Sequence, residues 1–196
     1  LKFFQNHGLF SLKKRPQWYT IKNRSRTYVK KILETISGEH YKNYRINKIT
    51  RFSNGVKVYY GGNNEFFDYD KVVIATHADE ALSLITDPTK EEKSILANFK
   101  YKNNIAIIHT DESLMPKNKK AWSSWNSSVN KNNTSENSIT YWLNLLQNLK
   151  TNKNIFLSLN PFLKIDQNKV ISKVKFTHPY YDKEALKNQN RLKNIQ

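Results

Sequence analysis

The chain has 196 residues, of which 38% are hydrophobic and 13% aromatic, so wholesale disorder is excluded and one ordinary domain with a core is expected. It contains no Cys, which excludes disulfides, thiolate catalysis and cysteine–zinc or iron–sulfur sites within these residues. The formal charge is +17, but the lysines are scattered through every segment, and scatter does not favour a nucleic-acid groove. No apolar run approaches the roughly 20 residues of a membrane span, and we expect a cytoplasmic location.

An apolar-aromatic stretch opens the chain and leads to a turn at Arg15-Pro16. The pattern then predicts a helix over residues 25–37, with Ser25 as its N-cap and Gly38 as its stop. Two alternating runs follow, over residues 44–52 and 56–60. The sequence Ser53-Asn54-Gly55 between them predicts a β-hairpin. A further short strand is expected from Phe66.

Residues 72–75 (VVIA) are continuously apolar, and with Thr76 they have the pattern of a short strand buried on both faces of a parallel sheet. A helix is predicted over residues 78–85. A second helix is predicted over residues 89–99, opened by a capping box in which Thr89 precedes Glu92 by three positions.

The remaining sequence predicts a second, largely antiparallel layer. Its expected strands cover residues 105–109, 121–125, 139–143, 155–159 and 170–177. Between them, residues 126–137 are polar and low in complexity, which indicates an exposed loop. A helix over residues 182–195 is expected to close the chain.

Together these segments resemble the flavin-containing amine oxidase superfamily. The stretch FDYDKVVIAT at residues 67–76 follows the hairpin. It resembles the D-x-V-V-x-A-T stretch through which the chain of that group returns to the sheet near FAD. The chain is most similar to a bacterial branch of predicted FAD/NAD-binding oxidoreductases, itself similar to the flavoprotein region fused to plant cyclopropane fatty acid synthases. The other matching segments are residues 3–9, 15–18, 25–29, 75–79, 109–111, 121–126, 140–142, 159–161 and 178–179.

The resemblance implies an α/β plus α+β fold, in which part of a Rossmann-like FAD/NAD(P)-binding domain is interleaved with a mixed or antiparallel substrate domain. Residues 1–37 then form a substrate-domain segment and a helix leading into the FAD domain, and residues 38–88 an FAD-domain segment with the hairpin and the parallel strand. Residues 89–177 form the substrate domain, and residues 178–196 a helix returning toward the FAD domain. The start at Leu1 favours an internal fragment.

FAD is the cofactor that the resemblance implies. Ile46 is expected beside the adenine through its backbone, and Ala75 allows a close approach of backbone to cofactor. Thr76 and His77, which follow Ala75, complete the expected cofactor-binding set. The sequence lacks the G-x-G-x-x-G turn and the glycine-rich closing segment of the family, so the chain alone is expected to bind FAD poorly and to be inactive.

Two further departures concern the backbone and the chemistry. Relatives carry Gly-Gly where this chain has Asn23-Arg24; Asn tolerates the left-handed region, whereas Arg24 adopts it at a cost. Amine oxidases commonly place a Lys opposite the flavin, by order near residues 103–105, where this chain has none. Lys102 is close, but a shift of one or two residues is expected to place its side chain on the wrong side of the strand.

His109 is the candidate catalytic residue, because His titrates near neutrality and this one lies in an apolar strand beside Thr110-Asp111. A hydrogen-bonded structural role is the alternative. No two His residues have metal-ligand spacing, so no metal site is expected. Trp122 and Trp125 should face opposite sides of a strand. The candidate substrate-binding residues are Trp122, Trp125, Asn126, Tyr141 and Asn144.

These expectations define three functional hypotheses. The first is an FAD-dependent oxidoreductase that removes a hydride from a C–N or C–C bond of a small or lipid substrate. The second is a flavoprotein of the same fold that modifies a fatty acyl chain, with its basic surface able to meet an anionic membrane. The third, from another class, is a basic nucleic-acid-binding module, although no specific nucleic acid is expected as a partner.

Overall fold

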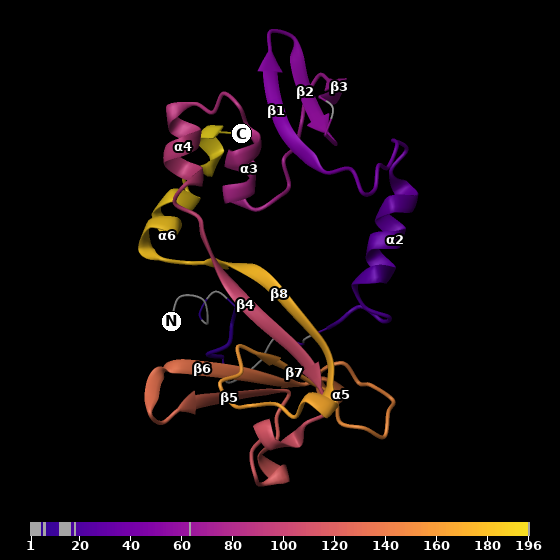
Figure 1. The fold of residues 1–196 in the computed structure, drawn as a ribbon, viewed down its shortest axis with the longest axis vertical. Helices are drawn as coiled ribbons and strands as arrows, with labels where there is room; N and C mark the ends of the chain where they lie inside the picture. The colour runs from indigo at the N-terminus through magenta and orange to yellow at the C-terminus, as the bar shows by residue number, and fades with distance from the viewer. Residues whose placement is uncertain (1–4, 6, 12–16, 18, 63, 196) are drawn as a thin grey trace. The chain divides into compact units, whose positions relative to one another are not determined.

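The computed structural model describes residues 5, 7–11, 17, 19–62 and 64–195 (Figure 1). The chain divides into two compact units, Leu1–Tyr44 and Arg45–Gln196. The expected turn at Arg15-Pro16 lies outside the described residues. No helix within them is both long and apolar enough to cross a membrane.

The first unit contains the helix α2 (Ser25–Thr35). Its N-cap is Arg24 and not Ser25, and it ends before Gly38, the expected stop. Asn23 and Arg24 both have positive φ angles, 65° and 70°. Such angles are expected at these positions, because the family that the sequence resembles carries a Gly-Gly pair there. A left-handed Arg costs of the order of 1–3 kcal/mol, so the entry to α2 is strained at this residue.

The predicted hairpin is confirmed and belongs to a three-stranded antiparallel sheet of β1 (Ile46–Phe52), β2 (Gly55–Tyr60) and β3 (Glu65–Tyr69). Its turn consists of Ser53 and Asn54, because Gly55 already pairs with Phe52. A Cβ atom on Gly55 would lie 2.6 Å from the Tyr69 carbonyl oxygen, so only glycine fits there.

Residues 71–76 form no strand, so the prediction of a buried parallel strand is wrong for this chain. Val73 is 90% exposed, and no described residue makes a backbone hydrogen bond to residues 71–75. A parallel strand needs a hydrogen-bonded neighbour, and both sheets of the structure are antiparallel. The parallel pairing in the described residues is one isolated bridge between Ile49 and Ile85. The described residues therefore contain no Rossmann-like parallel sheet of the kind that was expected.

The two central helices agree with the sequence. The structure has α3 (Ala78–Leu84) and α4 (Lys90–Leu96), and the Thr89–Glu92 capping box is present in full. The Glu92 carboxylate also binds Arg51 of β1, at 2.8 Å from Nη1, which ties the hairpin to α4.

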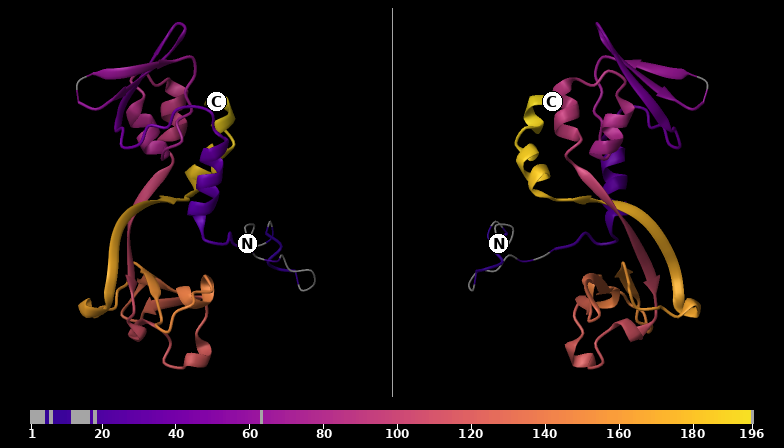
Figure 2. Two further views of the ribbon diagram at one scale, coloured as in Figure 1. Left: turned by 90° about the vertical axis from the view of Figure 1, so that its right-hand side faces the viewer. Right: turned by 60° about the vertical axis from the view of Figure 1, so that its left-hand side comes forward.

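The end of the chain returns to α4. The expected closing helix is broken into α6 (Lys183–Gln189) and the 3₁₀ turn η4 (Leu192–Ile195). Arg191 donates to the Ser94 hydroxyl and Asn194 donates to the Glu91 carboxylate. Both acceptors lie on α4, so these two bonds hold the end of the chain against that helix (Figures 1 and 2).

The larger sheet has five antiparallel strands in the order β5-β6-β7-β4-β8. The longest pairing joins β4 to β8, which curves beside it in Figure 2. Two helical turns, α5 (Leu143–Leu146) and η3 (Gln167–Lys169), lie between strands. The strands are β4 (Lys100–His109), β5 (Trp125–Asn130), β6 (Asn133–Trp142), β7 (Phe156–Leu159) and β8 (Val170–Tyr180).

Two predictions about this sheet are wrong. Residues 126–137, expected to be a loop, form most of the β5–β6 hairpin, because cross-strand pairing compensates for their polar side chains. Residues 121–125, expected to be a strand, are not one: Ala121 ends the second of two 3₁₀ turns, η1 (Glu112–Leu114) and η2 (Lys119–Ala121), and only Trp125 enters β5. The antiparallel character of the predicted second layer is confirmed.

Candidate functional site

A cavity of about 370 Å³ lies between the three-stranded sheet and residues 71–76. Ile46, Ala75 and Thr76, three of the four predicted cofactor-binding residues, line it together. The other lining residues are Ile49, Val58, Tyr69, Lys71, Val72, Val73, Ile74 and Leu84. The cavity is therefore mainly apolar, with Lys71 as its charged residue.

The backbone of residues 71–75 is available to a ligand at this cavity, since it makes no hydrogen bond to a described residue. The apolar side chains of this cavity suit a flat aromatic ring, and the mostly exposed backbone groups of residues 71–75 can offer hydrogen bonds to its edges. These residues could hold the adenine end of FAD, the cofactor that the sequence resemblance implies. The cavity supplies no glycine turn for a pyrophosphate, so these residues suit one end of the cofactor and not the whole of it.

His77, the fourth predicted cofactor residue, is next to the cavity in sequence but does not line it. Its ring stacks on Tyr101 of β4, with ring centroids 4.3 Å apart. Its Nδ1 atom lies 3.3 Å from the Thr177 hydroxyl, and Tyr101 accepts a hydrogen bond from the Ala78 N–H. These contacts give His77 a structural role, holding the start of α3 against the β4–β8 pair.

His109, the predicted catalytic residue, is fully buried in the larger sheet and is separate from the cavity. Its Nδ1 accepts a hydrogen bond from the Asp111 N–H at 3.1 Å. Nε2 therefore carries the hydrogen and donates to the Ser158 hydroxyl at 2.9 Å. In this tautomer His109 does not accept a proton from Ser158, so the pair is not an activated nucleophile.

The contacts of His109 continue across the sheet as a polar row, which we define as His109, Ser158, Thr140 and Asn126. The Ser158 and Thr140 hydroxyls are 2.7 Å apart, and Asn126 donates to the Thr140 carbonyl. These residues come from four adjacent strands, and every buried side-chain polar atom in the described residues has a partner. The row satisfies its own hydrogen bonds within the core.

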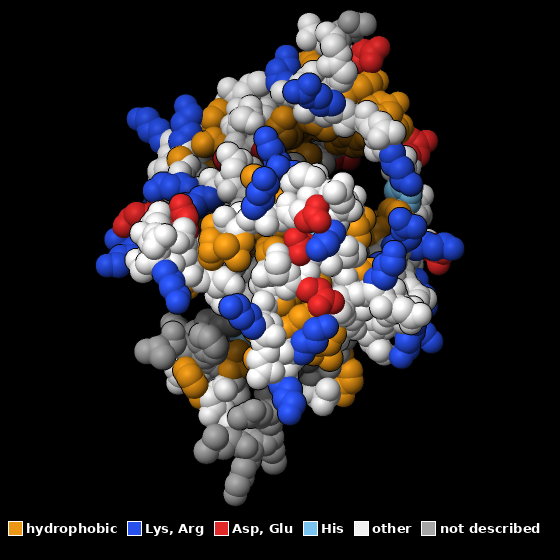
Figure 3. All heavy atoms as spheres, turned by 60° about the horizontal axis from the view of Figure 1, so that its bottom comes forward, with side chains coloured by type: hydrophobic (Ala, Val, Ile, Leu, Met, Phe, Trp, Pro, Cys, Tyr) orange, Lys and Arg blue, Asp and Glu red, His pale blue; other side chains and the backbone are white. Residues whose placement is uncertain are grey.

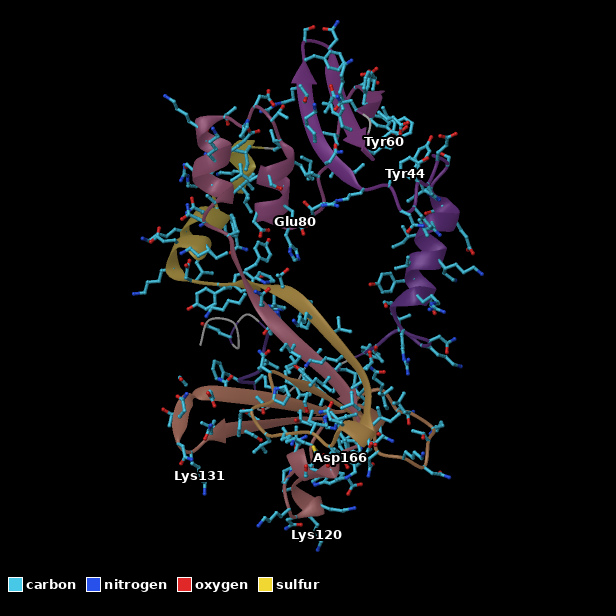
Figure 4. All side chains as sticks on the ribbon, in the orientation of Figure 1. Tyr44, Tyr60, Glu80, Lys120, Lys131 and Asp166 are labelled. Carbon is cyan, nitrogen blue, oxygen red and sulfur yellow. The ribbon has the colours of Figure 1, made fainter. Side chains whose placement is uncertain are left out.

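Burial lowers the pKa of His109 below its ordinary value, against the raising effect of the Asp111 carboxylate. The pKa of Asp111 itself falls to about 2. Burial alone raises that pKa, but the N–H groups of Asp166 and Ser113 and the ammonium of Lys169 together favour the carboxylate. Asp111 thus links the end of β4 to the loop that carries Asp166, labelled in Figure 4.

Three of the five predicted substrate residues make internal contacts. Asn126 is buried and bonds both the Ser123 backbone and Thr140. The Trp122 indole donates to the Pro116 carbonyl, and its ring packs edge-on against Phe156. Asn144 holds residues 153 and 155 through its side-chain amide. Their expected contact with substrate stays a prediction.

Trp125 and Tyr141 behave differently, because they pack edge to face on the other side of the larger sheet. By strand register this side, which we call the open face, is mainly apolar. Trp125 on it is 66% exposed and Val174 52% exposed. The open face comprises Trp125 and Val129, Ile139 and Tyr141, Leu157 and Leu159, Ala106 and Ile108, and Val174 and Phe176.

Sequence reasoning missed most of the open face. The signal was the alternation Ala106, Ile108 on β4 and Val174, Phe176 on β8, which marks residues that share one side of a strand. By the same alternation Lys102 shares its side of β4 with Asn104 and lies on the opposite side from Asn103 and Ile105, so the expectation for Lys102 stays a prediction.

No family model and no curated protein sequence matches the chain. Among solved structures, the fold is similar to the crystal structure of a CLA-producing fatty acid isomerase from P. acnes. The TM-score is 0.55, with 11% identical residues, over 88% of this chain. The chain spans 44% of that protein's length. This likeness shows that the chain shares a fold with a substantial part of a fatty acid isomerase.

Proposed function

We propose that this chain is part of an enzyme that modifies an unsaturated or methylated fatty acyl chain with the help of FAD. The observation that carries the proposal is the open face, an exposed apolar surface of the larger sheet in a fold similar to that of a fatty acid isomerase. Oxidation of a C–N bond is the less favoured alternative.

The open face suits a long hydrocarbon chain. Burying apolar surface is worth roughly 25 cal/mol per Å², or about 0.8 kcal/mol per methylene group. An acyl chain on Leu157, Ile108 and Val174 gains this term along its length, whereas a short amine gains little of it. Trp125 and Tyr141 add two ring surfaces at the β5 side.

Residues around the cavity lined by Ile46 and residues 71–76 are proposed to hold one end of the cofactor. Ile46 and residues 71–75 present backbone groups, and Ala75 leaves room for a ring beside them. When bound, a flavin supplies hydride transfer, the step that changes the bonding of an acyl chain. The protein's own contribution is to position the chain and to exclude water from it.

The nucleic-acid alternative has no comparable support. Figure 3 shows Lys and Arg side chains distributed over the visible face between apolar and polar ones. Lys120 and Lys131, labelled in Figure 4, come from separate segments and both are exposed. Binding to a nucleic acid requires cations and aromatics gathered along one groove.

The proposal is tested by a conversion assay on the longest coding sequence that contains this chain, supplied with FAD. The assay offers oleate, linoleate and a primary amine of matched chain length, and mass spectrometry follows the products. We expect a changed acyl chain from a fatty acid and no aldehyde from the amine. Oxidation of the amine alone would contradict the proposal.

The cofactor assignment has its own test, made by FAD titration of the same protein. Ile46→Pro removes an N–H at the first residue of β1, where proline is tolerated in a strand, whereas Ile46→Val keeps it. We expect Ile46→Val to bind FAD as the parent does and Ile46→Pro to lose binding while still unfolding cooperatively. Equal affinity in both variants removes the Ile46 backbone from the site.

A further inference from the structure

We propose that Lys102 anchors the free carboxylate of a long-chain fatty acid whose hydrocarbon tail lies along the open face. This inference rests on the proposed function and adds the direction of the chain and the group that recognises its head. It follows from what the register of β4 and β8 places at one end of that face.

Lys102 lies at the head of the open face. On β4, Lys102, Asn104, Ala106 and Ile108 alternate onto one side, opposite His178, Phe176, Val174 and Ser172 of β8. The side therefore changes from cationic at Lys102 to apolar at Ala106 and Ile108. An amphiphile with an anionic head and an apolar tail has the complementary pattern.

Lys102 has a free positive charge in the part of the chain that is described. Its Nζ lies 3.8 Å from the ring centroid of Tyr180 and makes no ion pair with a described carboxylate. Lys100, the next lysine on this side, is already paired with Asp182 at 2.9 Å. The Tyr180 ring holds the ammonium in place through a cation–π contact, and the N–H groups that do not point at the ring remain for a ligand.

Two side chains beside Lys102 make hydrogen bonds within the fold. Nδ1 of His178 lies 3.1 Å from the Pro179 carbonyl, which can only accept, so that nitrogen is the donor in this bond. Both ends of the Asn104 amide are also engaged, with the Lys102 carbonyl and with Asn160. Lys102 is the lysine at this end of the open face, and His178 lies opposite it on β8.

The length of the strand fits a long acyl chain. Ile108 lies six positions after Lys102, and an extended strand rises about 3.3 Å per residue, so the two lie roughly 20 Å apart along β4. A long-chain fatty acid reaches from the ammonium to the apolar group formed by Ile108, Leu157 and Tyr141. A short-chain acid cannot occupy both.

The test measures Kd for oleate and for oleyl alcohol, both below their micelle concentrations, from amide chemical-shift changes in the 196-residue chain. Lys102→Ala is compared with Lys175→Ala, which removes an exposed lysine from the opposite side of β8. We expect Lys102→Ala to weaken oleate binding about three- to ten-fold and to leave oleyl alcohol unchanged. Lys175→Ala should change neither. Equal losses for the two lysine variants, or an equal loss for the alcohol, overturn the anchor.

A third variant separates the anchor from the face itself. Val174→Glu places a carboxylate among the apolar side chains, at a position that is already 52% exposed and therefore tolerant. We expect it to abolish binding of both ligands. If it does so while Lys102→Ala has no effect, the acyl-binding face stands and the anchor is rejected. If oleate binding survives both changes, the lipid binds elsewhere; if the parent chain binds neither ligand, the proposed function fails as well.

Discussion

The polar row and residues 72–76 reverse the usual relation between composition and burial. The row consists of His109, Ser158, Thr140 and Asn126, and all four are buried. Residues 72–76 are almost wholly apolar, yet Val72 and Val73 are exposed. The difference lies in their partners, since the row has hydrogen-bonded neighbours on four strands and the apolar segment has no paired strand.

Hydrophobicity therefore decides burial here only after backbone pairing is provided. A strand with unpaired N–H and C=O groups gains little from an apolar sequence, because burying those groups without partners costs free energy. Polar side chains can be buried when each forms a hydrogen bond with another buried group. Four changes to the chain probe this contrast, in order of decreasing expected effect.

The largest effect is expected at the ring that packs beside the polar row. Phe156 is fully buried, in contact with both His109 and Trp122. Phe156→Ala should lower the free energy of unfolding by about 3–5 kcal/mol, measured by urea denaturation. Val73→Ala, at the exposed apolar segment, is the control and should change it by less than about 0.5 kcal/mol. Similar losses in the two variants would show that residues 72–76 are as buried as the sheet.

A second effect depends on pH. The pKa of Asp111 is about 2 in the folded chain, below its ordinary 3.8, so its ionised form stabilises the fold above pH 3.8. That stabilisation is lost as pH falls from 3.8 toward 2. Asp111→Asn should therefore cost about 2 kcal/mol at pH 7, and the cost should shrink below pH 3.8. A penalty that is the same at pH 7 and pH 2 would contradict this role of the carboxylate.

The coupling within the polar row should be smaller. Ser158 and Thr140 share a 2.7 Å hydrogen bond, so Ser158→Ala and Thr140→Val should not be additive. A double-mutant cycle on unfolding free energies should give a coupling of about 1 kcal/mol. Simple additivity would mean that the two hydroxyls are buried independently.

The smallest effect is expected at Ala75, which is exposed in this chain. Ala75→Leu should change stability here by less than about 0.5 kcal/mol. In a longer protein that provides parallel neighbours for residues 72–76, the same change should cost about 1–3 kcal/mol by overpacking. Thermal unfolding of both proteins gives the comparison, and equal midpoints in parent and variant of the longer protein would exclude a buried strand there.

Local signals in the sequence predicted local structure well. The turn around Asn54, the Thr89–Glu92 capping box and the positive φ of Arg24 each depend on residues close in sequence, and each is confirmed apart from the one-residue shift of the turn. The β5–β6 hairpin was missed because its stability comes from cross-strand pairing, which composition does not reveal.

The candidate site was predictable only in part. Ile46, Ala75 and Thr76 line one cavity, whereas His77 does not and residues 71–76 are not the expected strand, so their contact with a cofactor stays a prediction. The substrate residues were chosen as aromatic or amide side chains, and only Trp125 and Tyr141 lie on the open face. Which side of a strand a residue occupies depends on register, and register is fixed by tertiary pairing.

The exposure of the open face has an evolutionary consequence. Selection removes substitutions that bring a protein below its stability threshold, and buried positions such as Phe156 are held by that limit. Trp125 and Val174, which contribute far less buried area, are free of it. A lineage that carries this chain can therefore alter the shape of this surface by single mutations, without first acquiring compensating changes in the core.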